Sequence, residues 1–245
     1  MNRLMLALAA ATGMIGGAGA VMAWGAFGHG PAAPERARTE QIVKDYLLSH
    51  PEILPEAMGV LRDRETGRQI AAEGAAFTQP YGSAWAGNAN AELTIIEYFD
   101  YNCGYCRAVL PDIDRLLAAN PQVRIVYREL PILAEESRLA ARYSLVAAEQ
   151  GRFREFHRAL YAAGPVSPET IERAVAAAGM DAAAAREAAT APRIGAEIDK
   201  NVAAAARLRM TGTPSWVIGD RVVSSALPLD ELQRLVDEAR ARRRS

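Results

Sequence analysis

The feature that most limits how this chain can fold is a pair of cysteines, Cys103 and Cys106, separated by Gly104 and Tyr105. An apolar run at residues 93–99 precedes the pair, and a helical pattern follows it. A dithiol at a strand-to-helix junction is typical of thiol–disulfide exchange, because the free N–H groups and the dipole of a helix N-terminus stabilise a thiolate. We therefore predict that Cys103 is an exposed nucleophile and that Cys106, one turn further along, is the resolving thiol.

Two other interpretations of the cysteine pair are weaker. A zinc site generally needs four ligands, but the chain has no other cysteine, and its three histidines, His29, His50 and His157, are scattered. We interpret these histidines as surface or capping residues. A structural disulfide across so short a loop would stabilise the fold little. The sequence thus predicts no metal, and no cofactor beyond a redox-active Cys103–Cys106 disulfide.

The N-terminal residues have the pattern of an export signal. Arg3 supplies a short positive region, and residues 4–27 carry no charge. We predict a signal peptide over residues 1–23, cleaved after Ala20 or Ala23. The alternative is a membrane anchor retained to about residue 27, but the run is rich in Gly and Ala, which makes it a weak anchor. Either outcome places the rest of the chain where disulfides persist, so the lone cysteine pair is available for chemistry.

Charge excludes one class of partner. The net charge is −1 at pH 7, and no extended basic region suggests nucleic acid binding. The arginine-rich stretch at residues 240–244 is interpreted as the solvated end of a helix, with a docking patch as the alternative.

Before the cysteines, the sequence predicts a spacer and a helical segment. Residues 28–38 are rich in Gly, Ala and Pro, and we expect a linker there. Residues 39–75 have helical spacing, and Ser49–Glu52 resembles a capping box between two helices. Apolar residues lie on one side of each helix: Ile42, Val43, Tyr46, Leu47, Ile53, Leu54, Ala57, Met58 and Leu61. They pack either against the same domain or against another copy, in an oligomer formed through residues 39–72.

From residue 78 the pattern predicts an α/β domain. Residues 78–90 are turn-rich, and a strand at 93–99, a helix from Cys103 to about Ala119 and a strand at 123–127 make a parallel βαβ unit. Asn102 is the expected N-cap of that helix, and Pro111 is expected to kink it.

The rest of the domain is predicted to be helical before strands return. Residues 134–209 are Ala-rich and punctuated by Gly and Pro, which predicts four or five short helices, one beginning at Ser167-Pro168-Glu169. A hairpin of residues 215–218 and 221–224 and a closing helix from Leu229 complete the order βαβ, helical insertion, ββα.

Thr211-Gly212-Thr213-Pro214 stands directly before the hairpin. With the dithiol and the order of elements, it makes residues 78–242 resemble the DsbA-type thioredoxin-fold oxidoreductases of bacterial envelopes. The resemblance implies an α/β thioredoxin fold with an inserted all-helical subdomain, preceded here by an N-terminal helical segment, and a periplasmic location. It also implies a cis Thr213–Pro214 bond that faces the dithiol and leaves the backbone before it free to pair with an extended substrate. Pro111 matches the family's kink proline.

Glu97 lies six residues before Cys103, where the family often carries an acid near the inner cysteine. A buried carboxylate there could accept the proton of Cys106; the competing interpretation is a glutamate at the edge of the sheet that faces solvent. The neighbouring residues 100–102 are expected to shape the turn.

The dipeptide between the cysteines bears on the direction of the chemistry. Strongly oxidising members of the family carry Pro-His, whereas Gly104-Tyr105 and the Thr before the cis proline resemble disulfide isomerases. Residues 41–61 resemble the oligomerisation region of copper-sensitivity-suppressor C-type proteins. We therefore expect an isomerase or reductase that acts on unfolded or misoxidised exported proteins and is served by a membrane thiol reductase, or by an oxidase if it instead donates its disulfide. Two further hypotheses are a Cu(I)-binding module that uses both thiolates and a non-catalytic assembly protein.

Overall fold

A computed structural model describes residues 33–244, so the predicted signal peptide, or retained anchor, lies outside the described residues. The chain divides into two compact units, Met1–Met58 and Gly59–Ser245. The first contains α2 (Ala33–Ser49) and the start of α3 (Ile53–Ala72).

The expected linker at 28–38 is wrong for residues 33–38, which form the first turns of α2. Ala, Glu and Arg are good helix formers, and Glu35 lies near the positive end of the helix dipole. The predicted capping box is also wrong. Ser49 ends α2, and its hydroxyl donates to the Asp45 carbonyl instead of capping α3.

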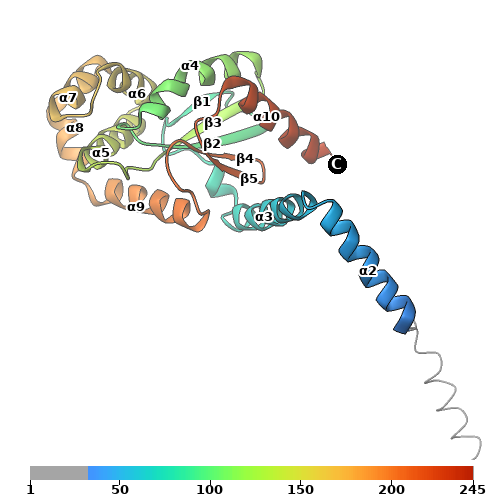
Figure 1. Cartoon of the computed structure of the whole chain (residues 1–245). Helices are drawn as coiled ribbons and strands as arrows, with labels where there is room; N and C mark the ends of the chain where they lie inside the picture. Colours follow the sequence, from blue (N-terminus) through green and yellow to red (C-terminus); the bar gives the residue numbers. More distant parts are fainter. Residues whose placement is uncertain (1–32, 245) are drawn as a thin grey trace, which may run out of the picture. The chain divides into compact units, whose positions relative to one another are not determined.

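The second unit is built on a five-stranded sheet in the order β1-β3-β2-β4-β5 (Figure 1). Its strands are β1 (Trp85–Gly87), β2 (Leu93–Phe99), β3 (Val123–Glu129), β4 (Ser215–Ile218) and β5 (Arg221–Ser224). Only β2 and β3 run parallel, with Glu97 directly opposite Tyr127. The other neighbouring pairs are antiparallel. This is the predicted thioredoxin-type arrangement, with β2 at its centre.

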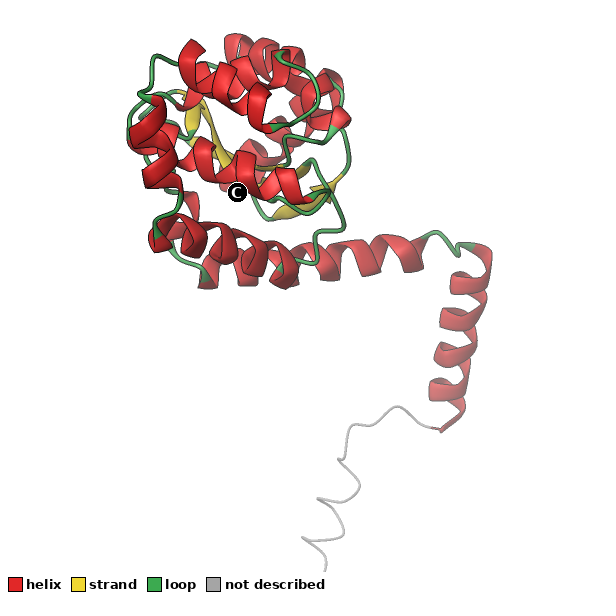
Figure 2. Ribbon diagram, turned by 90° about the vertical axis from the view of Figure 1, so that its left-hand side faces the viewer, coloured by secondary structure: helices red, strands yellow, loops and turns green. Residues whose placement is uncertain are grey.

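Helices cover both faces of the sheet, and Figure 2 shows the strands lying among them. One face packs against α4 (Gly104–Ala119) and α10 (Leu229–Arg244), whose inner residues join Ile95, Phe99 and Ile125 in the larger core. The other face packs against α9 (Pro192–Arg207) and the 3-10 helix η1 (Ala75–Thr78). Because successive strand residues point to opposite faces, Ile95, Glu97 and Phe99 all point toward α4.

The helical insertion consists of α5 (Glu135–Glu149), α6 (Phe153–Ala162), α7 (Pro168–Ala177), α8 (Ala182–Ala189) and α9. These five helices confirm the predicted helical stretch, and Ser167 and Thr170 form a capping box at the predicted start of α7. The strand β1 falls in the stretch expected to be turns. It has only three residues, and none is fully buried, so it leaves little pattern to detect.

The second half of α3, with Glu73 just after it, belongs to the second unit. Asp63 pairs with Arg221 at 2.8 Å, Glu73 pairs with Arg207, and Ile70 packs against the smaller core. Only the residues up to Met58 therefore fall outside this unit.

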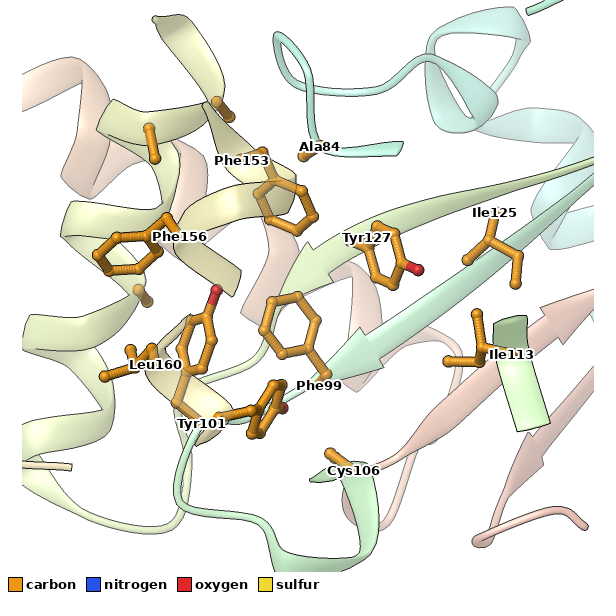
Figure 3. Packing of buried hydrophobic residues seen from close by; sticks show 14 of the residues in the cluster. Ala84, Phe99, Tyr101, Cys106, Ile113, Ile125, Tyr127, Phe153, Phe156 and Leu160 are labelled. Carbon is orange, nitrogen blue, oxygen red and sulfur yellow. The ribbon is translucent and has the colours of Figure 1, made fainter. Parts of the chain in front are cut away.

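Aromatic rings fill the core between β2, β3 and α6 (Figure 3). Phe99 makes edge contacts with Tyr101 and Tyr127, and His157 stacks on Phe153 with 5.0 Å between ring centroids. The prediction that His157 is a surface residue is wrong, because this cluster buries it. Its Nδ1 atom lies 3.1 Å from the Tyr101 hydroxyl.

Candidate functional site

The two cysteines occupy the first turn of α4. Cys103 itself is the N-cap, and its sulfur accepts the N–H of Cys106 at 3.4 Å. The prediction of Asn102 as the N-cap is therefore wrong by one residue. The Asn102 side chain instead donates to Ser137, and its backbone N–H is bound by the Asp100 carboxylate. Both cysteines are free thiols, and Pro111 lies inside α4 as predicted.

The Cys103 sulfur faces the loop that precedes β4. It lies 3.1 Å from the Thr213 carbonyl oxygen, and the Thr213–Pro214 bond is cis. Cys103 is only 4% exposed, so the expectation of an exposed nucleophile is wrong: the loop covers the sulfur. Two nearby positions in the sequence are not closely packed, because a Cβ added to Gly104 or Gly212 would meet no atom within 4 Å.

Donors around the Cys103 sulfur stabilise its thiolate. The Cys106 thiol contributes most, and the Thr213 side chain and the N–H groups of Cys106 and Tyr105 add to it. Together they outweigh burial and lower the pKa of Cys103 to about 5. At neutral pH Cys103 is therefore a thiolate, the form that attacks disulfides.

Cys106 is tuned in the opposite direction. Burial raises the pKa of Cys106, and its donation to Cys103 and the nearby charge of Glu97 raise it further. The thiol keeps its proton until a base removes it. The two cysteines therefore have the distinct properties of an attacking and a resolving thiol.

Glu97 is the nearest candidate base. It is 1% exposed, which excludes a solvent-facing glutamate. Burial and the charge of Cys103 raise the pKa of Glu97 to about 8. No described residue makes a hydrogen bond to its Oε2 atom. A carboxylate with a pKa near neutrality can accept a proton when the neighbouring thiolate loses its charge.

Two hydroxyls that the sequence did not single out hold the cis-proline loop. The Ser215 hydroxyl donates to the Gly212 carbonyl at 2.6 Å and lies 2.7 Å from the Ser224 hydroxyl. Ser224 also accepts the N–H of Thr211. The register that pairs Ser215 with Ser224 makes this possible, and no local sequence signal carries that register.

Asp100 holds a second loop beside the dithiol. Its buried carboxylate accepts the N–H groups of Asn102, Ile132 and Leu133 at 2.8–3.0 Å. Its backbone carbonyl accepts the N–H of Cys103 at 3.0 Å. Residues 100–102 thus shape the turn as expected, and Asp100 also fastens the loop after β3.

The fold and the site define a thioredoxin-fold protein with a dithiol opposite a cis proline. Residues 94–237 match the DSBA model, the DsbA-like thioredoxin domain. This match spans more than half of the chain, which therefore belongs to the DsbA-like thioredoxin family. Residues 35–66 match the N-terminal domain of the copper resistance protein ScsC.

Solved structures agree with this assignment. A thioredoxin-like oxidoreductase from Silicibacter pomeroyi is 38% identical, with 66% of this chain and 94% of that one covered and a TM-score of 0.64. A linker-deletion variant of Proteus mirabilis ScsC is 26% identical, with 88% and 99% covered and a TM-score of 0.67. A periplasmic thioredoxin-like protein from Salmonella enterica serovar Typhimurium is 27% identical, with 69% and 95% covered and a TM-score of 0.61.

The curated relatives are longer proteins. The Na(+)/H(+) antiporter NhaA 3 of Salinispora tropica is 32% identical over 138 residues, which are 55% of this chain and 21% of the antiporter. The chain thus spans about a fifth of that relative's length. Among residues 33–244, the structure has no helix with the length and hydropathy to span a bilayer.

Proposed function

We propose that this protein is an exported thiol–disulfide oxidoreductase that acts on disulfides of other proteins, as an isomerase or reductase. The observation that carries the proposal is the contrast between the two thiols. Cys103 is held as a thiolate opposite the cis Thr213–Pro214 bond, while Cys106 is buried and protonated behind it. Such a pair can form and then resolve a mixed disulfide.

In the first step, the Cys103 thiolate attacks one sulfur of a substrate disulfide. The substrate S–S bond breaks, its other sulfur leaves as a thiolate, and a mixed disulfide forms at Cys103. In reduction, Cys106 then gives its proton to Glu97 and attacks the Cys103 sulfur. The mixed S–S bond breaks, the second substrate sulfur leaves as a thiolate, and the Cys103–Cys106 disulfide forms, so the substrate has gained two electrons. In isomerisation, a different substrate thiolate attacks the mixed disulfide and releases Cys103 unchanged.

Two observations support isomerase or reductase activity over primary oxidation. Gly104 and Tyr105 provide no basic side chain to stabilise the thiolate further, and Tyr105 is exposed. Residues 35–66 match the ScsC N-terminal domain, in line with the resemblance of residues 41–61 to the oligomerisation region of copper-sensitivity-suppressor C-type proteins. That resemblance supports an isomerase organised through residues 39–72 as a homo-oligomer. Exposed apolar residues of α2, among them Ile42, Val43 and Tyr46, offer a surface for that assembly.

The cellular setting is part of the proposal. The Salmonella relative is a periplasmic protein, and with the predicted export signal this supports a periplasmic location. The substrates would be unfolded or misoxidised exported proteins. A membrane thiol reductase would keep Cys103 reduced, because isomerisation needs the free thiolate.

The test combines an equilibrium measurement with two activity assays. The dithiol is equilibrated with glutathione buffers to obtain its reduction potential, and scrambled and reduced ribonuclease are offered as substrates. We expect recovery of the scrambled substrate and a potential below that of dedicated oxidases, whose value is about −120 mV. Rapid oxidation of the reduced substrate without recovery of the scrambled one would instead identify an oxidase.

Two variants and one titration serve as controls. C103S should abolish both activities, and C106S should retain the ability to form mixed disulfides while losing reduction. Titration of the reduced protein with Cu(I) tests the hypothesis of a copper-binding module. Tight binding of one equivalent that is lost in C103S, without disulfide chemistry, would favour that hypothesis.

A further inference from the structure

We propose that Tyr127, with one water molecule in a small cavity behind it, carries the proton of Glu97 to the protein surface. The proposal rests on the proposed redox function and extends it to a residue outside the dithiol motif. Tyr127 acts on the sulfurs only through Glu97, so it is a positioning residue for proton transfer.

A route for the proton is needed because Glu97 is buried. While Cys103 is a thiolate, its charge helps keep Glu97 protonated. Formation of the mixed disulfide removes that charge, and Glu97 must then lose its proton before it can act as the base for Cys106. Glu97 is buried, and no described residue is hydrogen-bonded to its Oε2 atom. The proton therefore needs a carrier.

Tyr127 lies on the neighbouring strand at the right position. It is directly opposite Glu97 in the parallel ladder, so both side chains point toward α4. Glu97 is the charged group that acts most strongly on Tyr127, and Asp114 is the next. In Figure 3 the Tyr127 hydroxyl is directed toward Ile113 and Ile125, away from Phe153. The phenol thus lies between the strand that carries the buried carboxyl and the inner face of α4, where Ile113 is buried.

A cavity of about 20 Å³ lies between β1, β3, α4 and α6, which is room for about one water molecule. Tyr127, His157, Asp114 and Arg158 are among its lining residues. The Nε2 atom of His157 is buried and has no partner among the described residues. Burial keeps this ring neutral and lowers the pKa of His157 to about 3, so Nε2 can bond a water. Asp114 pairs with Arg158 at the exposed end.

The proton balance is simple. Glu97 gives its proton to the Tyr127 oxygen, directly or through water, as Tyr127 gives its own proton to the cavity water. That water passes a proton to solvent past Asp114, and Tyr127 remains neutral. The groups that set the pH dependence face the route from each packed element. They are Cys103, Cys106 and Asp114 of α4 and its cap, Glu97 of β2 and Tyr101 just after it, Glu129 of β3, and Arg154, His157, Arg158 and Tyr161 of α6.

The test separates attack from resolution. The reduced full-length protein is mixed with 5,5′-dithiobis(2-nitrobenzoic acid), which releases one coloured thiolate when Cys103 attacks and a second when Cys106 resolves the mixed disulfide. We expect Y127F to leave the first phase unchanged and to slow the second by roughly tenfold near neutral pH. The difference in second-phase rate between Y127F and the wild type should narrow as the pH rises above the pKa of Glu97, because Glu97 then has no proton to lose.

Two further variants make the result decisive. Tyr98 is the matched control because it is a buried tyrosine next to Glu97 whose side chain packs in the smaller core on the opposite face of the sheet; Y98F should leave both phases unchanged. A86V fills the cavity and should slow the second phase without removing the hydroxyl. The proposal would be overturned if the second phase had the same rate in Y127F and the wild type at every pH. It would also be overturned if A86V left the rate of the second phase unchanged. Absence of any second phase in the wild type would instead refute the redox function itself.

Discussion

The sulfur of Cys103 lies 3.1 Å from the carbonyl oxygen of Thr213, a residue 110 positions further along the chain. The side chain of the same threonine stabilises the Cys103 thiolate. Its hydroxyl is buried and has no hydrogen-bond partner among residues 33–244, so it is free to donate to the sulfur. One residue therefore both covers the nucleophile and tunes it. Under the proposed function its backbone would pair with an extended substrate, which would link substrate binding and thiolate stability at this position.

Replacing Thr213 with Val should raise the pKa of Cys103 from about 5. The substitution keeps the branched shape and removes one donor to the thiolate. A hydrogen bond to a charged group contributes about 1.5–3 kcal/mol, and one pKa unit corresponds to about 1.4 kcal/mol, so we expect a rise of about one to two units. The measurement is the ultraviolet absorbance of the thiolate as a function of pH.

T211V is the control, because Thr211 lies in the same loop but contributes only its backbone N–H to a contact. The pKa of Cys103 should stay unchanged in that variant. An unchanged pKa in T213V as well would show that the Thr213 hydroxyl plays no part.

Replacing Glu97 with Gln should change how stability depends on pH. The pKa of Glu97 is raised to about 8 in the folded protein, so the folded state holds a proton that the unfolded state releases above about 4.3. The stabilisation is complete below the unfolded pKa and is lost as the pH rises through the folded pKa. The contribution of Glu97 to the free energy of unfolding should fall by at most about 1.4 kcal/mol per pH unit in that window.

The measurement is urea unfolding of the reduced wild type and E97Q between pH 4 and pH 9. E97Q should lack this slope and should become the more stable protein at the alkaline end. If the free energy of unfolding changed with pH in the same way in both proteins, Glu97 would not be a buried, protonated group in the folded state. Glu92, which is exposed and stands just before β2, provides the matched control as E92Q.

Replacing Asp100 with Asn should loosen the loop after β3. The carboxylate accepts three backbone N–H groups, and an amide places its own N–H groups against at least one of them. A buried donor left unpaired costs about 1–3 kcal/mol. We expect lower thermal stability and slower attack by Cys103, whose N–H is bound by the same residue.

Asp199 offers a comparison for this variant, because it forms an exposed ion pair with Arg138. D199N should cost at most about 1 kcal/mol. Equal losses of thermal stability in D100N and D199N would show that the Asp100 contacts do not hold the loop in place.

The local pattern predicted the elements that position the site. An apolar run whose residues are almost all buried forms β2 at 93–99, and a helix start follows at the cysteines, so the strand-to-helix junction could be found without a structure. The burial of Glu97 could not be decided in the same way. It depends on α4 lying over this face of the sheet, which is a tertiary contact.

The residues that the sequence missed act through long-range register. Tyr127 gains its place from the pairing of β2 with β3, and Ser224 from the pairing of β4 with β5. His157 was expected at the surface because a lone histidine has no local signal for burial. Its position is fixed by aromatic rings from β2, β3 and α6. The exposure of Cys103 was misjudged for the same reason, since the covering Thr213 is distant in sequence.

The proposed oligomer can be tested with a single substitution in α2. Val43 is 52% exposed and lines an apolar hollow with Leu47 and Leu48. If this side chain is buried between copies, its burial contributes about 1.5–3 kcal/mol, so V43E should weaken self-association at least tenfold. Sedimentation velocity at several concentrations measures the change.

The matched control for V43E is Q41K, because Gln41 is bonded to Asp45 and a lysine there would keep a favourable contact. Q41K should therefore associate like the wild type. A wild type that is monomeric throughout, or an equal effect of both variants, would refute assembly through this face. Because residues 59–72 belong to the second unit, a complementary deletion should remove residues 39–58 alone. It should abolish self-association while leaving attack by Cys103 intact.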